Sequence, residues 1–240
     1  MKIRIAYIEE PPFYWTAKDG SVTGADIELA DVVLRAIGVT AIEFVPTSFD
    51  EFLPGVNQGR WDMNVPIFVT PERAKHVAFS LPVWGLGDGF LVRPGNPKAL
   101  NGYAELAARA DARLGVIAGQ VQVNTAKAAG VSDGQLVVLR DQPEAITALT
   151  AGEIDAFAAT AIGNRATAEG NPEVEAVAHV LGVGAAPPVG AYSFAPGNQA
   201  LLQAVNGQLR RYLGSADHRA RMAKFGITAT EIDVALEQSK

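Results

Sequence analysis

Cysteine is absent from this sequence of 240 residues, and histidine is scarce. Without cysteine there is no disulfide framework, no thiolate metal site and no cysteine nucleophile. The histidines His76, His179 and His218 are scattered and lack the spacing of metal ligands. We therefore expect no protein-bound metal and no cofactor.

Long apolar runs and basic stripes are also missing. No segment is apolar over the length of a transmembrane helix, and no signal-peptide pattern precedes the first apolar segment. Either an export leader was removed or the protein is cytoplasmic. The formal net charge of −6 and the pI near 5.1 argue against nucleic-acid binding. The densest basic stretch, residues 210–224, follows a helical pattern and indicates a solvated helix face.

Strand-like and helix-like segments alternate along the chain. Short apolar segments predict strands at residues 3–8, 41–45, 61–68, 88–92, 113–117, 135–139, 154–158, 174–180 and 189–194. Helical spacing predicts helices at residues 26–37, 121–129, 143–151, 163–169, 198–213 and 215–224, and a short helix ending near residue 56. This alternation predicts an α/β fold with mainly parallel sheets flanked by helices.

Two zones rich in proline and glycine divide the series. They lie at residues 93–97 and 182–188. The simplest arrangement has residues 1–92 and 189–240 forming one lobe, with residues 93–188 inserted as the other. Two connections between lobes form a hinge, and a cleft between hinged lobes can enclose a small ligand.

Several short motifs occur in a characteristic order. They are Pro11-Pro12-Phe13, Gly24-Ala25-Asp26-Ile27-Glu28-Leu29-Ala30, Trp61-Asp62, Thr70-Pro71-Glu72-Arg73, Val77-Ala78-Phe79-Ser80, Gly152-Glu153-Ile154-Asp155-Ala156 and Gly190-Ala191-Tyr192-Ser193-Phe194 with Asn206. Together they resemble the family 3 extracellular solute-binding proteins, the polar amino-acid receptors of ABC importers. The resemblance implies a type 2 periplasmic binding protein fold with a two-strand hinge. It also implies a periplasmic monomer that delivers a small ligand to an ABC transporter permease.

Arg73 is the strongest candidate for a ligand-binding residue. It closes Thr70-Pro71-Glu72-Arg73, which resembles the family's carboxylate-binding motif. A planar guanidinium donates two parallel hydrogen bonds to a carboxylate, a geometry that lysine cannot copy. From spacing alone, Arg73 would be a surface arginine at a helix start.

The resemblance adds aromatic candidates. It places Phe13 at the mouth of the cleft, Phe49 against the ligand, and Phe68 where most amino-acid receptors carry a small or hydroxyl residue. Trp84 fits a site or a core position equally well, and core packing is the alternative for Phe13.

The second lobe departs from the amino-acid receptor pattern. Thr160 stands where related receptors place the aspartate that holds the ligand ammonium, and it carries no charge. Gln120 lies in a turn that in relatives offers threonine hydroxyls to the ligand carboxylate. An ordinary α-amino acid would therefore find fewer partners for its ammonium, and a buried unpaired charge is costly.

Glu10 lies three residues before Phe13, at the end of the first predicted strand. Several rings and one carboxylate can hold a delocalised or methylated cation. The set Glu10, Phe13, Phe49, Phe68 and Arg73 looks like that of the ectoine and hydroxyectoine receptors of this family. The alternative for Glu10 is a solvated carboxylate.

Three functions fit this fold. The first is capture of a small amino-acid-like or compatible-solute zwitterion, such as an ectoine or betaine, for an ABC importer. The second is an enzyme like the cyclohexadienyl and arogenate dehydratases, which resemble this family. The third is a ligand-sensing receptor module. No Gly-x-Ser-x-Gly elbow and no phosphate loop is present, so we expect a binding protein and not an enzyme.

Overall fold

A computed structural model describes residues 1–180 and 186–239. The chain divides into two compact units, Met1–Leu86 with Ala186–Lys240 and Gly87–Ala185. Our expected first boundary lay after residue 92. However, β8 (Asp88–Val92) pairs with β11 (Ala156–Thr160) and β12 (Glu175–Ala178), and residues 87–92 therefore belong to the second unit. Of the second predicted connection, residues 182–185 lie outside the described part of the chain.

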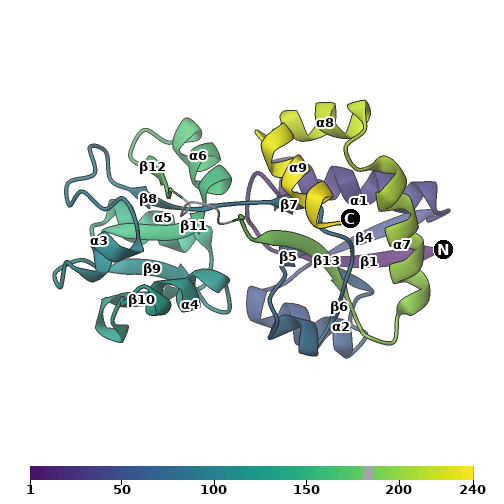
Figure 1. Cartoon of the computed structure of the whole chain (residues 1–240), viewed down its shortest axis with the longest axis horizontal. Helices are drawn as coiled ribbons and strands as arrows, with labels where there is room; N and C mark the ends of the chain where they lie inside the picture. The colour runs from purple at the N-terminus through teal and green to yellow at the C-terminus, as the bar shows by residue number, and fades with distance from the viewer. Residues whose placement is uncertain (181–185, 240) are drawn as a thin grey trace. The chain divides into compact units, whose positions relative to one another are not determined.

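The first unit is built on a sheet with the strand order β4-β1-β5-β13-β6, and β7 pairs with the same β13 strand (Figure 1). Its strands are β1 (Lys2–Tyr7), β4 (Ala41–Pro46), β5 (Met63–Phe68), β6 (Ala78–Phe79), β7 (Trp84–Gly85) and β13 (Val189–Phe194), and a separate hairpin pairs β2 (Trp15–Thr16) with β3 (Val22–Thr23). β4, β1 and β5 are parallel, and β13 runs antiparallel to its neighbours. β5 and β13 are buried at every position, as expected of strands covered on both faces.

Helices complete this unit. They are α1 (Ala25–Ala36), α2 (Phe52–Asn57), α7 (Gln199–Tyr212), α8 (Ala216–Ala223) and α9 (Ala229–Gln238), with the 3-10 helices η1 (Phe49–Glu51) and η2 (Arg73–Lys75). The apolar stripe of α1 includes Ile27, Val33 and Leu34, all buried. α1 packs against α7 and α8, α2 packs against β5, and α9 packs against β7.

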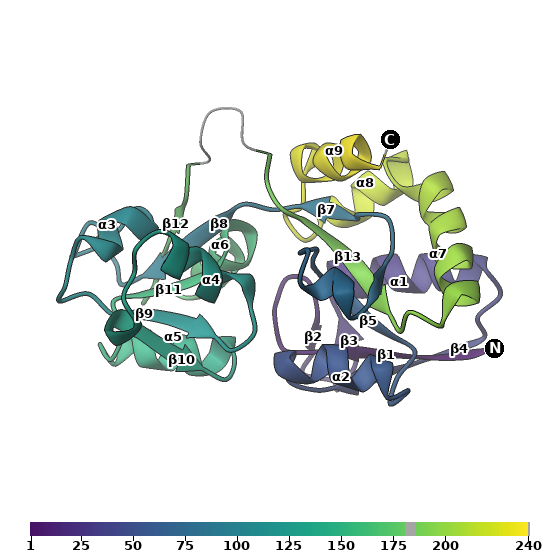
Figure 2. The same cartoon turned by 60° about the horizontal axis from the view of Figure 1, so that its bottom comes forward.

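The second unit has the strand order β10-β9-β11-β8-β12, and its elements are labelled in Figure 2. The remaining elements are β9 (Leu114–Ile117), β10 (Leu136–Leu139), α3 (Tyr103–Ala107), α4 (Val121–Ala128), η3 (Asp133–Gln135), α5 (Gln142–Thr150) and α6 (Ala161–Gly170). β10, β9 and β11 are parallel, whereas β8 is antiparallel to both of its neighbours. The predicted α/β class is therefore confirmed, with three adjacent parallel strands in each unit and antiparallel strands beside them.

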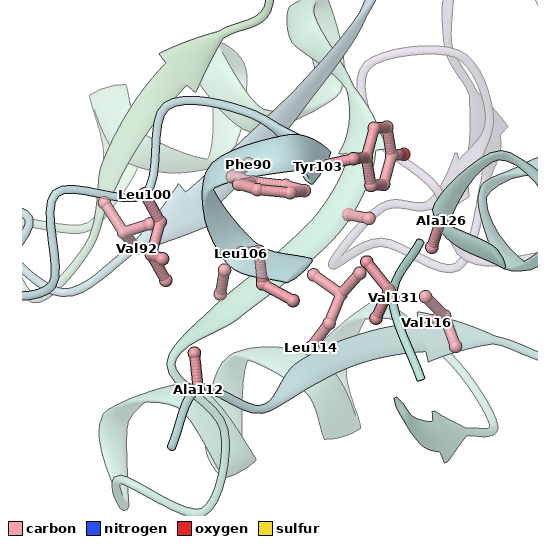
Figure 3. Close-up of a cluster of buried hydrophobic side chains, with 12 residues drawn as sticks. Phe90, Val92, Leu100, Tyr103, Leu106, Ala112, Leu114, Val116, Ala126 and Val131 are labelled. Carbon is pink, nitrogen blue, oxygen red and sulfur yellow. The ribbon is translucent and has the colours of Figure 1, made fainter. Parts of the chain in front are cut away.

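A core of buried side chains holds the second unit together (Figure 3). Phe90 of β8 meets Tyr103 of α3 edge to face, with ring centroids 5.1 Å apart. Leu106 of α3 and Leu114 of β9 are fully buried in the same cluster. This core therefore includes β8, which explains why our boundary after residue 92 was too late.

Within residues 1–180 and 186–239, no helix has both the length and the apolar character needed to cross a membrane.

Candidate functional site

Three of the predicted aromatic residues pack together in the first unit. Trp84 opens β7, Phe68 ends β5, and Phe13 lies in the turn after β1. The Trp84 ring centroid is 5.9 Å from that of Phe13 and 5.2 Å from that of Phe68, the latter in an edge-to-face contact. All three side chains are buried. The structure thus assembles these rings from segments far apart in the sequence.

Arg73 lies beside this aromatic cluster. Its Nη1 donates a hydrogen bond of 2.7 Å to the carbonyl oxygen of Phe68, and its backbone N–H donates to Thr70 Oγ1 at 3.1 Å. The guanidinium carbon is 5.0 Å from the ring centroid of Phe49 at the start of η1, within cation–π range. Burial lowers the pKa of Arg73 to about 10, which still leaves the side chain charged at neutral pH. The predicted residues Phe49, Phe68 and Arg73 are therefore neighbours.

Glu10 belongs to the same group, in a tight turn that follows β1. An isolated bridge pairs Glu10 with Tyr14, and the Tyr14 hydroxyl donates to Glu10 Oε2 at 3.1 Å. Burial raises the pKa of Glu10 to about 7, although the Tyr14 hydrogen bond and the positive charge of Arg73 both lower it. A carboxyl that titrates near neutral pH close to an arginine is typical of a functional site.

Sequence reasoning missed one polar residue of this group, Tyr14, and one that contacts it, Asp26. Tyr14 is buried and holds Glu10, and Asp26 is buried and accepts a hydrogen bond from Trp84 Nε1 at 3.0 Å. Asp26 stands in a motif that we used only to assign the family. Its position in the first turn of α1, on the buried side of the helix, could have identified it as a buried polar residue.

Gly24 lets the chain bring Phe13 against the start of α1. Its φ of +132° lies in a region that disfavours other residues, and a Cβ there would lie 2.2 Å from the Phe13 carbonyl oxygen. The close approach lets the N–H groups of Ala25 and Asp26 donate to the carbonyls of Pro12 and Phe13, each at 3.0 Å. Gly24 therefore fixes where the Phe13 ring lies.

We predict that Gly24→Ala destabilises the protein by about 2 kcal/mol more than Gly20→Ala, because overpacking against backbone adds to the strain of positive φ. Gly20 is a matched control, since its φ is +82° and nothing lies within 4 Å of an added Cβ. Urea denaturation of both variants measures the difference. Equal destabilisation would show that Phe13 moves aside at no cost.

The second unit carries the remaining predicted residues. Gln120 is the N-cap residue of α4, and Thr160 ends β11 and caps α6 by accepting a 3.1 Å hydrogen bond from the Gly163 N–H. Both side chains are buried. We expected the strand at 154–158 to end before Thr160, and the observed strand is shifted by two residues, covering 156–160.

Asp88 lies directly opposite Thr160 in the antiparallel pairing of β8 and β11. Its carboxylate accepts hydrogen bonds from the Tyr103 hydroxyl at 2.9 Å and from Gln122 Nε2 at 2.8 Å. Burial raises the pKa of Asp88. The second unit thus has a carboxyl group beside Thr160, which sequence reasoning missed because the two residues are distant in the chain.

The first-unit group, which we call the ring cluster, comprises Glu10, Phe13, Tyr14, Phe49, Phe68, Arg73 and Trp84. It contains a guanidinium suited to a carboxylate, a carboxyl suited to a cation, and several aromatic rings. In the described part of the chain, no group of three or more histidine, aspartate and glutamate side chains is arranged to hold a metal ion. The arrangement suits recognition of a small dipolar molecule.

Comparison with known proteins gives a family match over most of the chain. The model of the bacterial extracellular solute-binding proteins, family 3, matches residues 3–226. The probable amino-acid ABC transporter periplasmic-binding protein y4tE of Sinorhizobium fredii is 32% identical over 162 residues, which cover 66% of this chain and 53% of that protein. The L-cystine-binding protein TcyJ of Escherichia coli K12 is 33% identical over 87 residues, or 36% of this chain and 32% of TcyJ. The matches thus span about half or less of these relatives.

Solved structures resemble the chain over a greater length. EhuB in complex with hydroxyectoine has a TM-score of 0.87 and 27% identity, covering 98% of this chain and 91% of EhuB. An ancestral arginine-binding protein bound to glutamine has a TM-score of 0.82 and 26% identity, covering 93% of this chain and 97% of that one. These likenesses confirm the predicted two-lobed type 2 periplasmic binding protein fold. With the family match over residues 3–226, they show that the chain belongs to the bacterial extracellular solute-binding proteins, family 3.

Proposed function

We propose that this protein is the substrate-binding protein of an ABC importer and captures a small zwitterion. The family consists of extracellular solute-binding proteins, and y4tE is described as a probable periplasmic-binding protein of an amino-acid ABC transporter. We further propose that the protein works as a monomer in the periplasm, with an ABC transporter permease as its partner.

The single observation that carries the ligand class is the placement of Arg73 and Glu10 around one set of rings. Arg73 contacts Phe68 and Phe49, and its charge acts on the Glu10 carboxyl. A ligand with a carboxylate at one end and a delocalised or methylated cation at the other is complementary in charge to both groups. We therefore favour an ectoine or betaine over an ordinary amino acid, and the likeness to EhuB in complex with hydroxyectoine supports this choice.

Gln120 and Thr160 are the proposed ligand-binding residues of the second unit. Gln120 lies at the N-terminus of α4, where the helix dipole favours an anion such as the ligand carboxylate. Thr160 uses its oxygen as an acceptor in capping α6, so its hydroxyl hydrogen can be donated to a ligand acceptor. Neither residue carries a charge, and the carboxyl that lies beside Thr160, that of Asp88, is hydrogen-bonded to Tyr103 and Gln122.

Enzymatic dehydration is the second candidate function. The ancestral amino-acid-binding protein AncCDT-1, described as a precursor of cyclohexadienyl dehydratase, has a TM-score of 0.81 and 25% identity over 93% of this chain and 94% of that one. Glu10 has a pKa raised to about 7 by burial, a value suited to a general acid or base. AncCDT-1 is itself described as a binding protein, and we place this function second.

A thermal-shift panel of ectoines, betaines, standard amino acids and prephenate tests the proposal. A ligand that binds only the folded state raises the melting temperature. At a ligand concentration of about 100 times Kd, it adds about 2.7 kcal/mol to the free energy of unfolding. We expect the largest shift with an ectoine or betaine and no conversion of prephenate. A larger shift with a standard amino acid would reject the proposed ligand class, and turnover of prephenate would establish the enzyme.

Phe68→Ser tests the ring surface separately from the charges. We predict that the substitution weakens binding of hydroxyectoine or a betaine by about tenfold or more, because the ligand cation loses one ring and its apolar contact area. Binding of an amino acid should weaken less, since its ammonium can donate a hydrogen bond to the serine hydroxyl. Titration calorimetry with both ligand types measures the two ratios, and Phe44→Ser, outside the ring cluster, is the control. A greater loss for the amino acid would exclude the aromatic recognition of the cation.

A further inference from the structure

In the described part of the chain, Asp26 is hydrogen-bonded to three residues outside α1. Its N–H donates to the Phe13 carbonyl at 3.0 Å, and its own carbonyl accepts from the Tyr192 hydroxyl at 2.9 Å. Its side-chain Oδ1 accepts from Trp84 Nε1 at 3.0 Å. The residue is fully buried. One aspartate thus connects two members of the ring cluster, Phe13 through its backbone and Trp84 through its indole.

The Trp84 ring lies in a closely fitted space. A Cβ added to Gly190 on the neighbouring strand would lie 2.0 Å from the ring, so only glycine allows the ring to lie there. The ring also contacts Phe13 and Phe68. Packing alone sets the space, but the hydrogen bond from the indole N–H fixes which way the ring is turned within it.

Burying the Asp26 carboxyl at this position costs free energy. Within the described residues its Oδ2 has no hydrogen-bond partner, and an unsatisfied buried polar atom costs about 1–3 kcal/mol. Burial also raises the pKa of Asp26 well above its ordinary value, and the nearby Glu10 carboxyl adds to the rise. An apolar residue would avoid this cost but would leave the Trp84 indole N–H without its acceptor, so the hydrogen bond, and not packing, explains an aspartate here.

We propose that Asp26 is a positioning residue that holds the Trp84 indole against Phe13 and Phe68, and thereby sets the ring surface that the ligand meets. This inference rests on the proposed function, because the ring surface matters only if the cluster binds a ligand. The role requires a hydrogen-bond acceptor and no negative charge. Asparagine should therefore replace Asp26, whereas alanine should not.

The first test is a double-mutant cycle read as the Kd for hydroxyectoine. We expect Asp26→Asn to remain within about threefold of the parent and Asp26→Ala to weaken binding by about tenfold, the cost of a lost buried hydrogen bond. Trp84→Phe removes the indole N–H. In that background, adding Asp26→Ala should raise the Kd by less than about twofold. A full tenfold loss in the Trp84→Phe background would overturn the proposal.

The second test needs no ligand, so it separates this inference from the proposed function. The chain has three tryptophans and therefore three indole N–H signals in a 15N-labelled sample, and Trp84→Phe identifies that of Trp84. Asp26→Ala should move this signal and leave those of Trp15 and Trp61 in place, while Asp26→Asn should largely preserve it. If Asp26→Ala does not fold, Asp26→Leu replaces it, because leucine fills the space of the side chain without supplying a hydrogen-bond acceptor. An unmoved Trp84 signal would contradict the positioning role even if hydroxyectoine binds.

Discussion

Replacing Arg73 with alanine is expected to weaken binding of hydroxyectoine by roughly 30- to 5000-fold. Truncating one partner of a buried, hydrogen-bonded charge pair costs about 2–5 kcal/mol, and each 1.4 kcal/mol is about tenfold in Kd. The ligand carboxylate would lose its guanidinium partner in a half-buried place. Arg73→Lys should recover only part of the loss, because an ammonium cannot donate two parallel hydrogen bonds.

Titration calorimetry measures this effect, and Arg35→Ala is the matched control. Arg35 lies on α1 and pairs with Asp31 at 3.1 Å, on an exposed surface. Its removal should leave the Kd within about twofold, as expected of a surface ion pair. Circular dichroism must show that the Arg73 variant remains folded, since Arg73 also bonds to the Phe68 carbonyl. Unchanged affinity in a folded Arg73→Ala protein would show that the ligand binds elsewhere.

Binding of a ligand with a permanently charged ammonium group, such as glycine betaine, is expected to weaken as the pH falls below 7. Only the ionised form of Glu10 attracts the cation, and burial raises the pKa of Glu10 to about 7. Below that value the affinity should fall by up to tenfold for each pH unit. The charged and titratable groups around Glu10 are Arg73, Tyr14 and Asp26. Arg73 stays charged throughout this range.

The stability of the ligand-free protein should show the opposite trend. The folded state binds the Glu10 proton more tightly than the unfolded state, because its pKa is raised from 4.5 to about 7. This group's contribution to the free energy of unfolding is therefore fully present below about pH 4.5 and is lost as the pH rises through 7. A bound cation should offset that loss at high pH.

The variant Glu10→Gln tests whether Glu10 causes the pH dependence of binding. The amide keeps the size of the side chain but cannot ionise, so we expect weak binding of the betaine with little change between pH 5.5 and 8. Asp26→Asn is the comparison, since Asp26 also has a raised pKa. If the pH dependence of the Kd persists in Glu10→Gln and disappears in Asp26→Asn, the titrating group is Asp26 and the role given to Glu10 is wrong.

Periodicity identified the main elements of the fold because their apolar faces are long and regular. The strands at 88–92 and 189–194 have the predicted bounds, and the predicted helix at 198–213 corresponds to Gln199–Tyr212. The helix α9 was missed, although Thr228 and Glu231 form a capping box that the sequence displays. Very short strands such as β6 and β7 have no periodicity, since their pairing with β13 alone defines them.

Members of the candidate site could be proposed from the sequence where a residue stands in a motif, and not where only the fold brings it there. Arg73 and Phe13 follow from the family resemblance, and the structure places both in the ring cluster. Asp26 and Tyr14 act through contacts that depend on how α1 and the turn after β1 meet. Asp88 faces Thr160 only because β8 pairs antiparallel with β11. Such pairings are set by tertiary packing and leave no local pattern.

The most direct test of the account is calorimetric titration of the whole protein with hydroxyectoine at pH 7.5, beside the same titration of Arg73→Ala. We expect saturable binding of one ligand per chain in the parent protein, and binding at least about 30-fold weaker in the variant. The central claim is that the ring cluster recognises a small zwitterion through Arg73. Equal binding by both proteins, or tight binding of a standard amino acid with no response to hydroxyectoine, would contradict it.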